Sequence, residues 1–228
     1  MSSVPYRIRR SPRARVARIN VSPDGVEVVL PRRFPEREVE PFVREKSAWI
    51  ERTLRRFEES EQAFPRARVE NGGEVPYLGE RLVLRVHREA GRQRPHVKRR
   101  GDWLDVALPA RGELRDALER WYRRRAHAEI TPRLDAVCAR AGASYDRLSI
   151  RGQRTRWASC SSSGTMSFNW RLLLAPEEIL DYVVEHEVAH LERPDHSDRF
   201  WFLLASRCPE WREHEAWLRR HGHSLRLA

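Results

Sequence analysis

The first part of the chain alternates apolar and polar residues with a period of two, which is typical of β-strands. "YRIRRS", "ARVARINV" and "GVEVVLP" follow this pattern within residues 4–30, and Asp24-Gly25 is a turn signal for a hairpin. After Pro35 the apolar positions recur every three or four residues, which predicts a helix in "EREVEPFVREKSAWIERTLRRFEES". Residues 74–108 return to the strand pattern, and we expect a basic loop at 91–101 to interrupt it.

The later part of the chain has mainly helical spacing. A long helix is predicted from about residue 112 to 142, with Pro132 expected to kink it or to split it in two. Residues 147–176 predict two short strands around a Ser/Gly turn, and residues 176–222 are predicted to be helical. Strands first and helices last favour an α+β fold over an alternating βαβ fold.

The net charge of +11 raises the question of a nucleic-acid partner. Among the 44 basic residues only Lys46 and Lys98 are lysines, and the arginines are spread over the whole chain. This distribution indicates a compositional bias and a solvated basic surface. Nucleic acid is therefore a possible partner but not the favoured one.

Two further patterns bear on the cellular compartment. The N-terminal segment lacks the apolar stretch of a secretory signal, and no apolar run reaches the ~18 residues of a membrane span. Cys138, Cys160 and Cys208 are odd in number and far apart, so they form no disulfide framework. We expect a reduced, cytoplasmic protein with no membrane partner.

The string "HEVAH" lies within a well-marked predicted helix at residues 176–191. One helical turn separates His186 from His190, so both imidazoles can reach the same ion. Pro194 is expected to end the helix and let the chain turn back, which brings His196 within reach as a third ligand. Three neutral nitrogen ligands with an open fourth position are typical of a catalytic Zn²⁺ site.

Glu187 follows the first histidine and points about a quarter-turn away from it on the helix. It can therefore reach a metal-bound water without binding the ion itself. The metal lowers the pKa of this water, and we expect Glu187 to act as the general base during attack on a peptide carbonyl.

The segment "RTRWASCSSSGTMSFNWRLLLAPEEILDYVVEHEVAHLERPDHSDRFW" resembles the YgjP-like metallopeptidase family, whose relatives include the SprT and WLM zinc peptidases. The family pattern runs RWGSC, an asparagine in a strand, Leu-x-x-x-P, YVVxHELAH and HSxxFW. Ala158 replaces the usual glycine and Val188 the usual leucine, and neither is a proposed ligand. A weaker match extends upstream over nearly the whole chain.

The resemblance implies a zincin-type metallopeptidase core acting on a peptide or protein substrate. It also implies that His186, His190 and His196 bind zinc and that Glu187 is the catalytic base. We therefore predict a β-rich N-terminal region with one helix over residues 1–111 and a helical, zincin-like catalytic region over residues 112–228.

Several other residues are candidates for binding substrate. We expect the strand at 165–170 to present its edge to an extended peptide, with Asn169 facing the cleft. Arg154 and Arg156 precede "WASC" and are expected to stabilise an oxyanion or to bind a phosphate or carboxylate. The histidines near the C-terminal end are interpreted as solvated: His214, His221 and His223.

Two alternative functions stay open at this point. One is a metal-dependent nucleotide phosphoanhydride hydrolase, although the clustered carboxylates that usually hold Mg²⁺ are missing. The other is a DNA-associated protease, although the chain shows no localised basic stripe.

Overall fold

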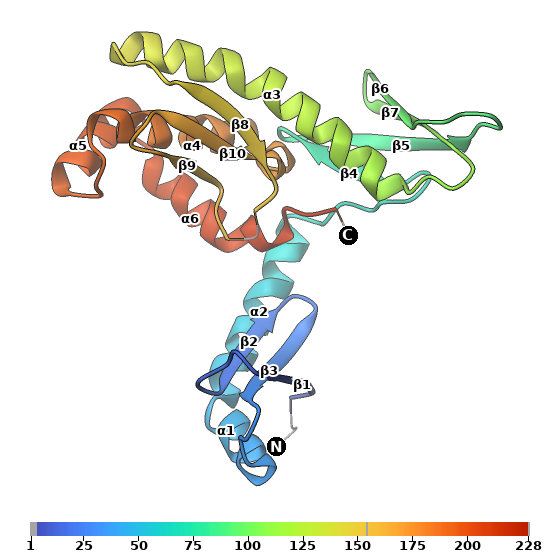
Figure 1. The fold of residues 1–228 in the computed structure, drawn as a ribbon, viewed down its shortest axis with the longest axis vertical. Helices are drawn as coiled ribbons and strands as arrows, with labels where there is room; N and C mark the ends of the chain where they lie inside the picture. The colour runs from blue at the N-terminus through green and yellow to red at the C-terminus, as the bar shows by residue number, and fades with distance from the viewer. Residues whose placement is uncertain (1–3, 154, 228) are drawn as a thin grey trace. The chain divides into compact units, whose positions relative to one another are not determined.

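The computed structural model describes residues 4–153 and 155–227 (Figure 1). Contacts within the chain define two compact units, one ending at Pro65 and the other starting at Arg66. The sequence predicted that the catalytic region begins at residue 112, and this boundary stays a prediction.

The first unit contains a three-stranded sheet and the predicted helical segment. The strands are β1 (Tyr6–Ser11), β2 (Arg18–Ser22) and β3 (Gly25–Pro31), in the order β1-β3-β2. β2 and β3 form the predicted hairpin, in which Ser22 pairs with Gly25, and Gly25 has a φ of +118° that favours glycine. A 3₁₀ turn (Glu36–Glu38) leads into α1 (Val39–Glu45) and α2 (Ser47–Ala63), which are separated at Lys46. The prediction of one helix in the N-terminal region was therefore wrong, because the segment forms two.

The core of the first unit forms because the apolar face of its sheet packs against the apolar faces of its helices. Its buried members come from β3, α1 and α2: Val26, Val28, Leu30, Val39, Val43 and Ile50.

The second unit begins with a four-stranded sheet. Its strands are β4 (Glu74–Tyr77), β5 (Glu80–Arg88), β6 (His96–Arg100) and β7 (Trp103–Leu108), in the order β4-β5-β7-β6. The prediction of a loop throughout 91–101 was wrong, because β6 lies within it. β6 is an edge strand that buries Val97, and most of its other residues are basic. Charged residues are common in edge strands, and they weaken the apolar–polar alternation by which a strand is predicted.

The long helix α3 (Leu114–Ala141) is continuous, so the prediction that Pro132 splits it was wrong. Pro132 has no N–H, so the carbonyl of Ala128 lacks its helical hydrogen-bond donor. Both residues are exposed. Buried residues on either side of the proline, Ile130 and Leu134, hold the helix against the core. Packing on one face thus outweighs the local cost of the proline.

A second small sheet follows α3 and lies beside the helical region. It contains β8 (Arg147–Arg151), β9 (Ala158–Cys160) and β10 (Thr165–Asn169), in the order β8-β10-β9, which is one strand more than predicted. β10 pairs with β8 on one side and with β9 on the other. The expectation that the strand at 165–170 presents its edge was therefore wrong, and the edge strands of this sheet are β8 and β9.

The remainder is helical, as predicted. A 3₁₀ helix (Trp170–Leu174) leads to α4 (Glu177–Glu192), followed by α5 (Asp198–Arg207), α6 (Trp211–His221) and a short 3₁₀ turn (Gly222–Ser224). α4 lies next to α3, β9, α5 and α6 (Figure 1). Its apolar stripe at Leu180, Val184 and Val188 is fully buried. Across residues 4–153 and 155–227, no helix has the length and apolar character needed to cross a membrane.

Candidate metal centre

Three histidines converge at the C-terminal end of α4. His186 and His190 lie one turn apart on the helix, and His196 comes from the turn that follows it. One ring nitrogen from each lies within 4.8 Å of the corresponding nitrogens of the other two, and Nε2 of His186 and Nε2 of His196 are 3.2 Å apart. The structure therefore brings together the three residues that the sequence predicted as ligands.

The turn between α4 and α5 has a local cause. α4 ends at Glu192, directly before the predicted break at Pro194, and the Ser197 N–H donates to Asp195 Oδ1 at 3.1 Å. α5 then begins at Asp198. The chain reverses over these few residues, so that His196 faces back toward α4.

Aromatic side chains of α5 hold two of the imidazole rings. Phe200 is fully buried and stacks on His190, with 4.5 Å between ring centroids. Trp201 stacks on His196 at 5.4 Å. Because stacking restricts ring rotation, the imidazoles are oriented before any ligand binds.

The donor set fits a metal ion bound by nitrogen ligands. Nδ1 of His190 lies 3.1 Å from the carbonyl oxygen of Arg193, so a proton on Nδ1 leaves Nε2 free to bind a metal. Burial, together with the two neighbouring histidines, lowers the pKa of His186 to about 3, which keeps the ring neutral. Burial also lowers the pKa of His190.

Glu187 lies beside these histidines and is only 6% exposed. Burial raises the pKa of its carboxyl to about 7, while a hydrogen bond from the Cys160 backbone N–H acts in the opposite direction. Oε2 of Glu187 is buried and has no hydrogen-bond partner among the described residues. Glu187 and His186 also line a cavity of about 360 Å³. The carboxylate thus has one oxygen held by the chain and one oxygen without a partner, in a residue that lines the cavity.

The edge of β9 faces the same side as Glu187. The Ser161 N–H donates to Thr165 O at 3.0 Å, and the Asn169 N–H donates to Trp157 O at 2.7 Å, so odd-numbered residues of this strand pair with β10. The backbone groups of Ala158 and Cys160 therefore point outward. Sequence reasoning missed the Cys160 N–H because backbone groups leave no signal in residue identity.

The predicted substrate residues are placed differently from one another. Asn169 is 2% exposed, and its Nδ2 donates to Gln153 O at 2.8 Å and to Arg156 O at 3.1 Å. Its Oδ1 accepts from the Arg171 N–H at 3.2 Å, so the amide holds the segment before β9 in place. Arg156 is exposed and lines the cavity beside Glu187. Arg154 lies outside the described residues.

The histidines near the C-terminal end are less solvated than predicted. His221 is only 7% exposed, and its ring lies 4.9 Å from that of Trp217. His214 is half-buried, 5.8 Å from the ring of Tyr182, and His223 is half-buried as well. The prediction was wrong because α6 packs on α4, which the local sequence does not reveal.

Comparisons with known proteins indicate the family to which this chain belongs. A family model described as YgjP-like, metallopeptidase domain, matches residues 15–221. Comparison with curated proteins finds no match.

Solved structures of two archaeal metallopeptidase zymogens show partial similarity. Jannalysin of Methanocaldococcus jannaschii is 20% identical, with a TM-score of 0.37, over 40% of this chain and 94% of that chain. Abylysin of Pyrococcus abyssi is 27% identical, with a TM-score of 0.36, over 38% of this chain and 89% of that chain. The family match, which spans most of the sequence, shows that this chain belongs to the YgjP-like metallopeptidases and is a hydrolase.

Proposed function

We propose that this protein is a zinc-dependent peptidase in which His186, His190 and His196 hold the metal and Glu187 is the general base. The observation that carries the proposal is the convergence of three imidazole nitrogens within 4.8 Å, next to a buried carboxylate. All four residues lie within 112–228, which supports the proposal that this region is the catalytic one.

The separation of the ring nitrogens supports zinc as the metal. Two nitrogens that bind one tetrahedral zinc ion at its usual bond length are about 3.3 Å apart. The Nε2 atoms of His186 and His196 are 3.2 Å apart. Neutral imidazoles also suit zinc better than they suit magnesium, which prefers oxygen ligands.

Zinc, when bound, supplies a Lewis acid that activates water and polarises a carbonyl group. Glu187 then serves as the proton acceptor. The Cys160 N–H fixes one of its oxygens, while Oε2 faces no donor of the described chain. Oε2 can therefore accept the proton of the attacking water and pass it to the departing amine.

The edge of β9 supports an extended peptide as the substrate. Its outward Ala158 N–H and C=O can pair with a peptide backbone, as in strand addition to a sheet edge. Such pairing depends on the backbone of the substrate peptide and not on its side chains.

Metal analysis of the purified protein, combined with two hydrolysis assays, tests the proposal. We expect about one zinc per chain, cleavage of an unfolded protein substrate and no hydrolysis of nucleoside triphosphates. Triphosphate hydrolysis without proteolysis, or a protein that binds no zinc, would refute the peptidase assignment.

A further inference from the structure

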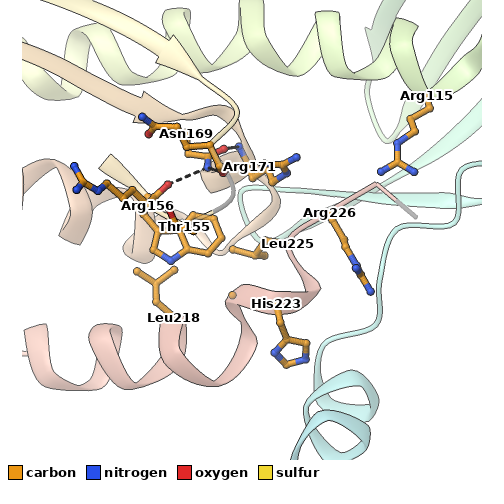
Figure 2. Close-up of a pocket in the computed structure, with 12 residues that line it drawn as sticks. Arg115, Thr155, Arg156, Asn169, Arg171, Leu218, His223, Leu225 and Arg226 are labelled. Atoms are coloured by element: carbon orange, nitrogen blue, oxygen red, sulfur yellow. Dashed lines mark hydrogen bonds between the residues drawn. The ribbon is translucent and has the colours of Figure 1, made fainter. Parts of the chain in front are cut away.

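A second cavity, of about 580 Å³, is lined by basic side chains (Figure 2). Arg115, Arg156 and Arg171 reach it from three separate segments, and Arg226 and His223 also line it. Among the described residues that line it, none is an aspartate or a glutamate. Such a surface attracts negatively charged ligands.

This basic cavity adjoins the cavity beside Glu187. Arg156, Trp157 and Leu218 line both of them. The Trp157 ring is held against the backbone of Gly222, where a Cβ atom would lie only 2.7 Å from Cζ2 of the ring. A ligand in the catalytic pocket can therefore continue into the basic cavity along one shared wall.

The chain holds the guanidinium of Arg171 and the backbone of Arg156 in place. The guanidinium of Arg171 donates to the carbonyl oxygens of Gly152 and Gln153, both at 3.2 Å. Asn169 donates to the carbonyl oxygen of Arg156 and so fixes its backbone. Within the described part of the chain, the side chains of Arg115 and Arg156 take part in no ion pair. Both guanidinium groups can therefore bind a ligand without first breaking a salt bridge.

The arrangement of these arginines favours a ligand with several charges. Figure 2 shows Arg115 and Arg156 at opposite sides of the cavity, with Arg171 between them. A single carboxylate cannot reach both sides, whereas a peptide segment with several acidic side chains can. Trp157, Leu218 and Leu225 add apolar surface, which suits a peptide.

The orientation of β9 indicates which end of the substrate enters the cavity. Antiparallel strand pairs are commoner than parallel ones, and a peptide antiparallel to β9 runs from Cys160 toward Ala158. Glu187 contacts the Cys160 end, so residues after the reacting bond pass Ala158 and then Arg156.

Resting on the proposed peptidase function, we infer that the basic cavity binds an acidic segment of the substrate on the C-terminal side of the cleaved bond. Arg115, Arg156 and Arg171 recognise its carboxylates by charge-assisted hydrogen bonds.

Quenched fluorescent peptides of one parent sequence test this inference. The first carries three glutamates shortly after the bond cleaved by the wild-type protein, the second has alanines there, and the third has the glutamates before the bond. We expect kcat/KM to be about tenfold higher for the first peptide than for the other two. Arg115→Gln and Arg156→Gln should each reduce this ratio about fivefold.

Two further variants sharpen the test. Arg115→Glu should reverse the preference, so that a peptide with lysines after the bond is cleaved faster than the glutamate peptide. Arg120→Gln is the matched control, because Arg120 is an exposed arginine of the same helix that does not line the cavity. It should keep the wild-type ratio.

Peptide binding is measured alongside cleavage, by fluorescence anisotropy of the labelled glutamate peptide. The two measurements together distinguish a failure of this inference from a failure of the proposed function. Equal cleavage of all three peptides, or a preference for glutamates before the bond, would overturn the inference and leave the peptidase assignment intact. Binding that depends on Arg115, without cleavage of any peptide, would overturn the peptidase assignment and keep the acidic ligand. Stronger competition by a single-stranded oligonucleotide than by the glutamate peptide would overturn the inference in favour of nucleic acid.

Discussion

The metal centre and the basic cavity are assembled from the chain in different ways, although the cavity beside Glu187 shares Arg156, Trp157 and Leu218 with the basic cavity. The three histidines and Glu187 lie within eleven consecutive residues, where a helix and one tight turn suffice to bring them together. The arginines of the basic cavity come from the start of α3, the segment before β9, the 3₁₀ helix after β10 and the residues after the last 3₁₀ turn. A locally built site can be recognised from residue spacing, whereas a site built from distant segments cannot.

The two cavities also differ in the chemistry that they offer. The cavity beside Glu187 combines the neutral imidazole of His186 with a buried carboxylate, which suits the proposed bond cleavage. The basic cavity combines several arginines with apolar surface, which suits binding. Substitutions in the first should therefore affect turnover, and substitutions in the second should affect the choice of substrate.

The largest expected effect follows from removing one metal ligand. His196→Ala should lose most of the bound zinc and reduce proteolysis at least ~10³-fold, since two imidazoles hold the ion far less tightly. Zinc content by mass spectrometry and cleavage of an unfolded protein provide the measurement. His96→Ala is the control, because His96 is an exposed histidine outside the cluster. Stoichiometric zinc in the His196 variant would contradict the proposed ligand set.

The next effect separates metal binding from proton transfer. Glu187→Gln should retain zinc but reduce kcat by about 10²–10⁴-fold, because an amide cannot accept the proton of the attacking water. Parallel metal analysis and steady-state kinetics distinguish this outcome from unfolding. Turnover close to that of the wild type would show that another group is the base.

A smaller effect is expected where the two cavities meet. Asn169→Ala removes three hydrogen bonds from a buried amide and leaves the carbonyl of Arg156 without its donor, while the carbonyl of Gln153 keeps the one from Arg171. We expect a loss of about 1–3 kcal/mol in the free energy of unfolding, together with a weaker preference for acidic peptides.

Denaturant unfolding measures the stability change for Asn169. Asn20→Ala is the control, since its amide bonds to Glu27 at an exposed position, and it should change stability by less than about 0.5 kcal/mol. Equal stability of the two variants would mean that Asn169 does not hold the segment.

The smallest effect concerns duplex DNA. If the arginine-rich surface is mainly compositional, duplex binding should be weak at near-physiological salt, fall steeply with added salt and show no sequence preference. Peptide hydrolysis should be unchanged by the duplex. A titration followed by anisotropy, with and without the peptidase assay, checks this expectation. Tight binding, or strong stimulation of cleavage, would favour a DNA-associated protease.

Much of the architecture and the metal cluster followed from the sequence alone. The period-two segments formed strands, the helical segments formed helices, and the spacing of "HEVAH" with Pro194 and His196 predicted three converging imidazoles. These features depend on backbone periodicity and on contacts between residues close in the chain, and both are recorded in residue order.

Tertiary structure decided what local patterns leave open. It made β9 an edge strand and placed β10, which carries "TMSFN", in the centre of the sheet with a partner on both sides. It kept α3 continuous through Pro132, buried His221 and brought Arg115 near Arg171. Each outcome depends on which distant surfaces pack together. Because such packing sums many weak contacts between segments far apart in the chain, no single stretch of sequence determines it.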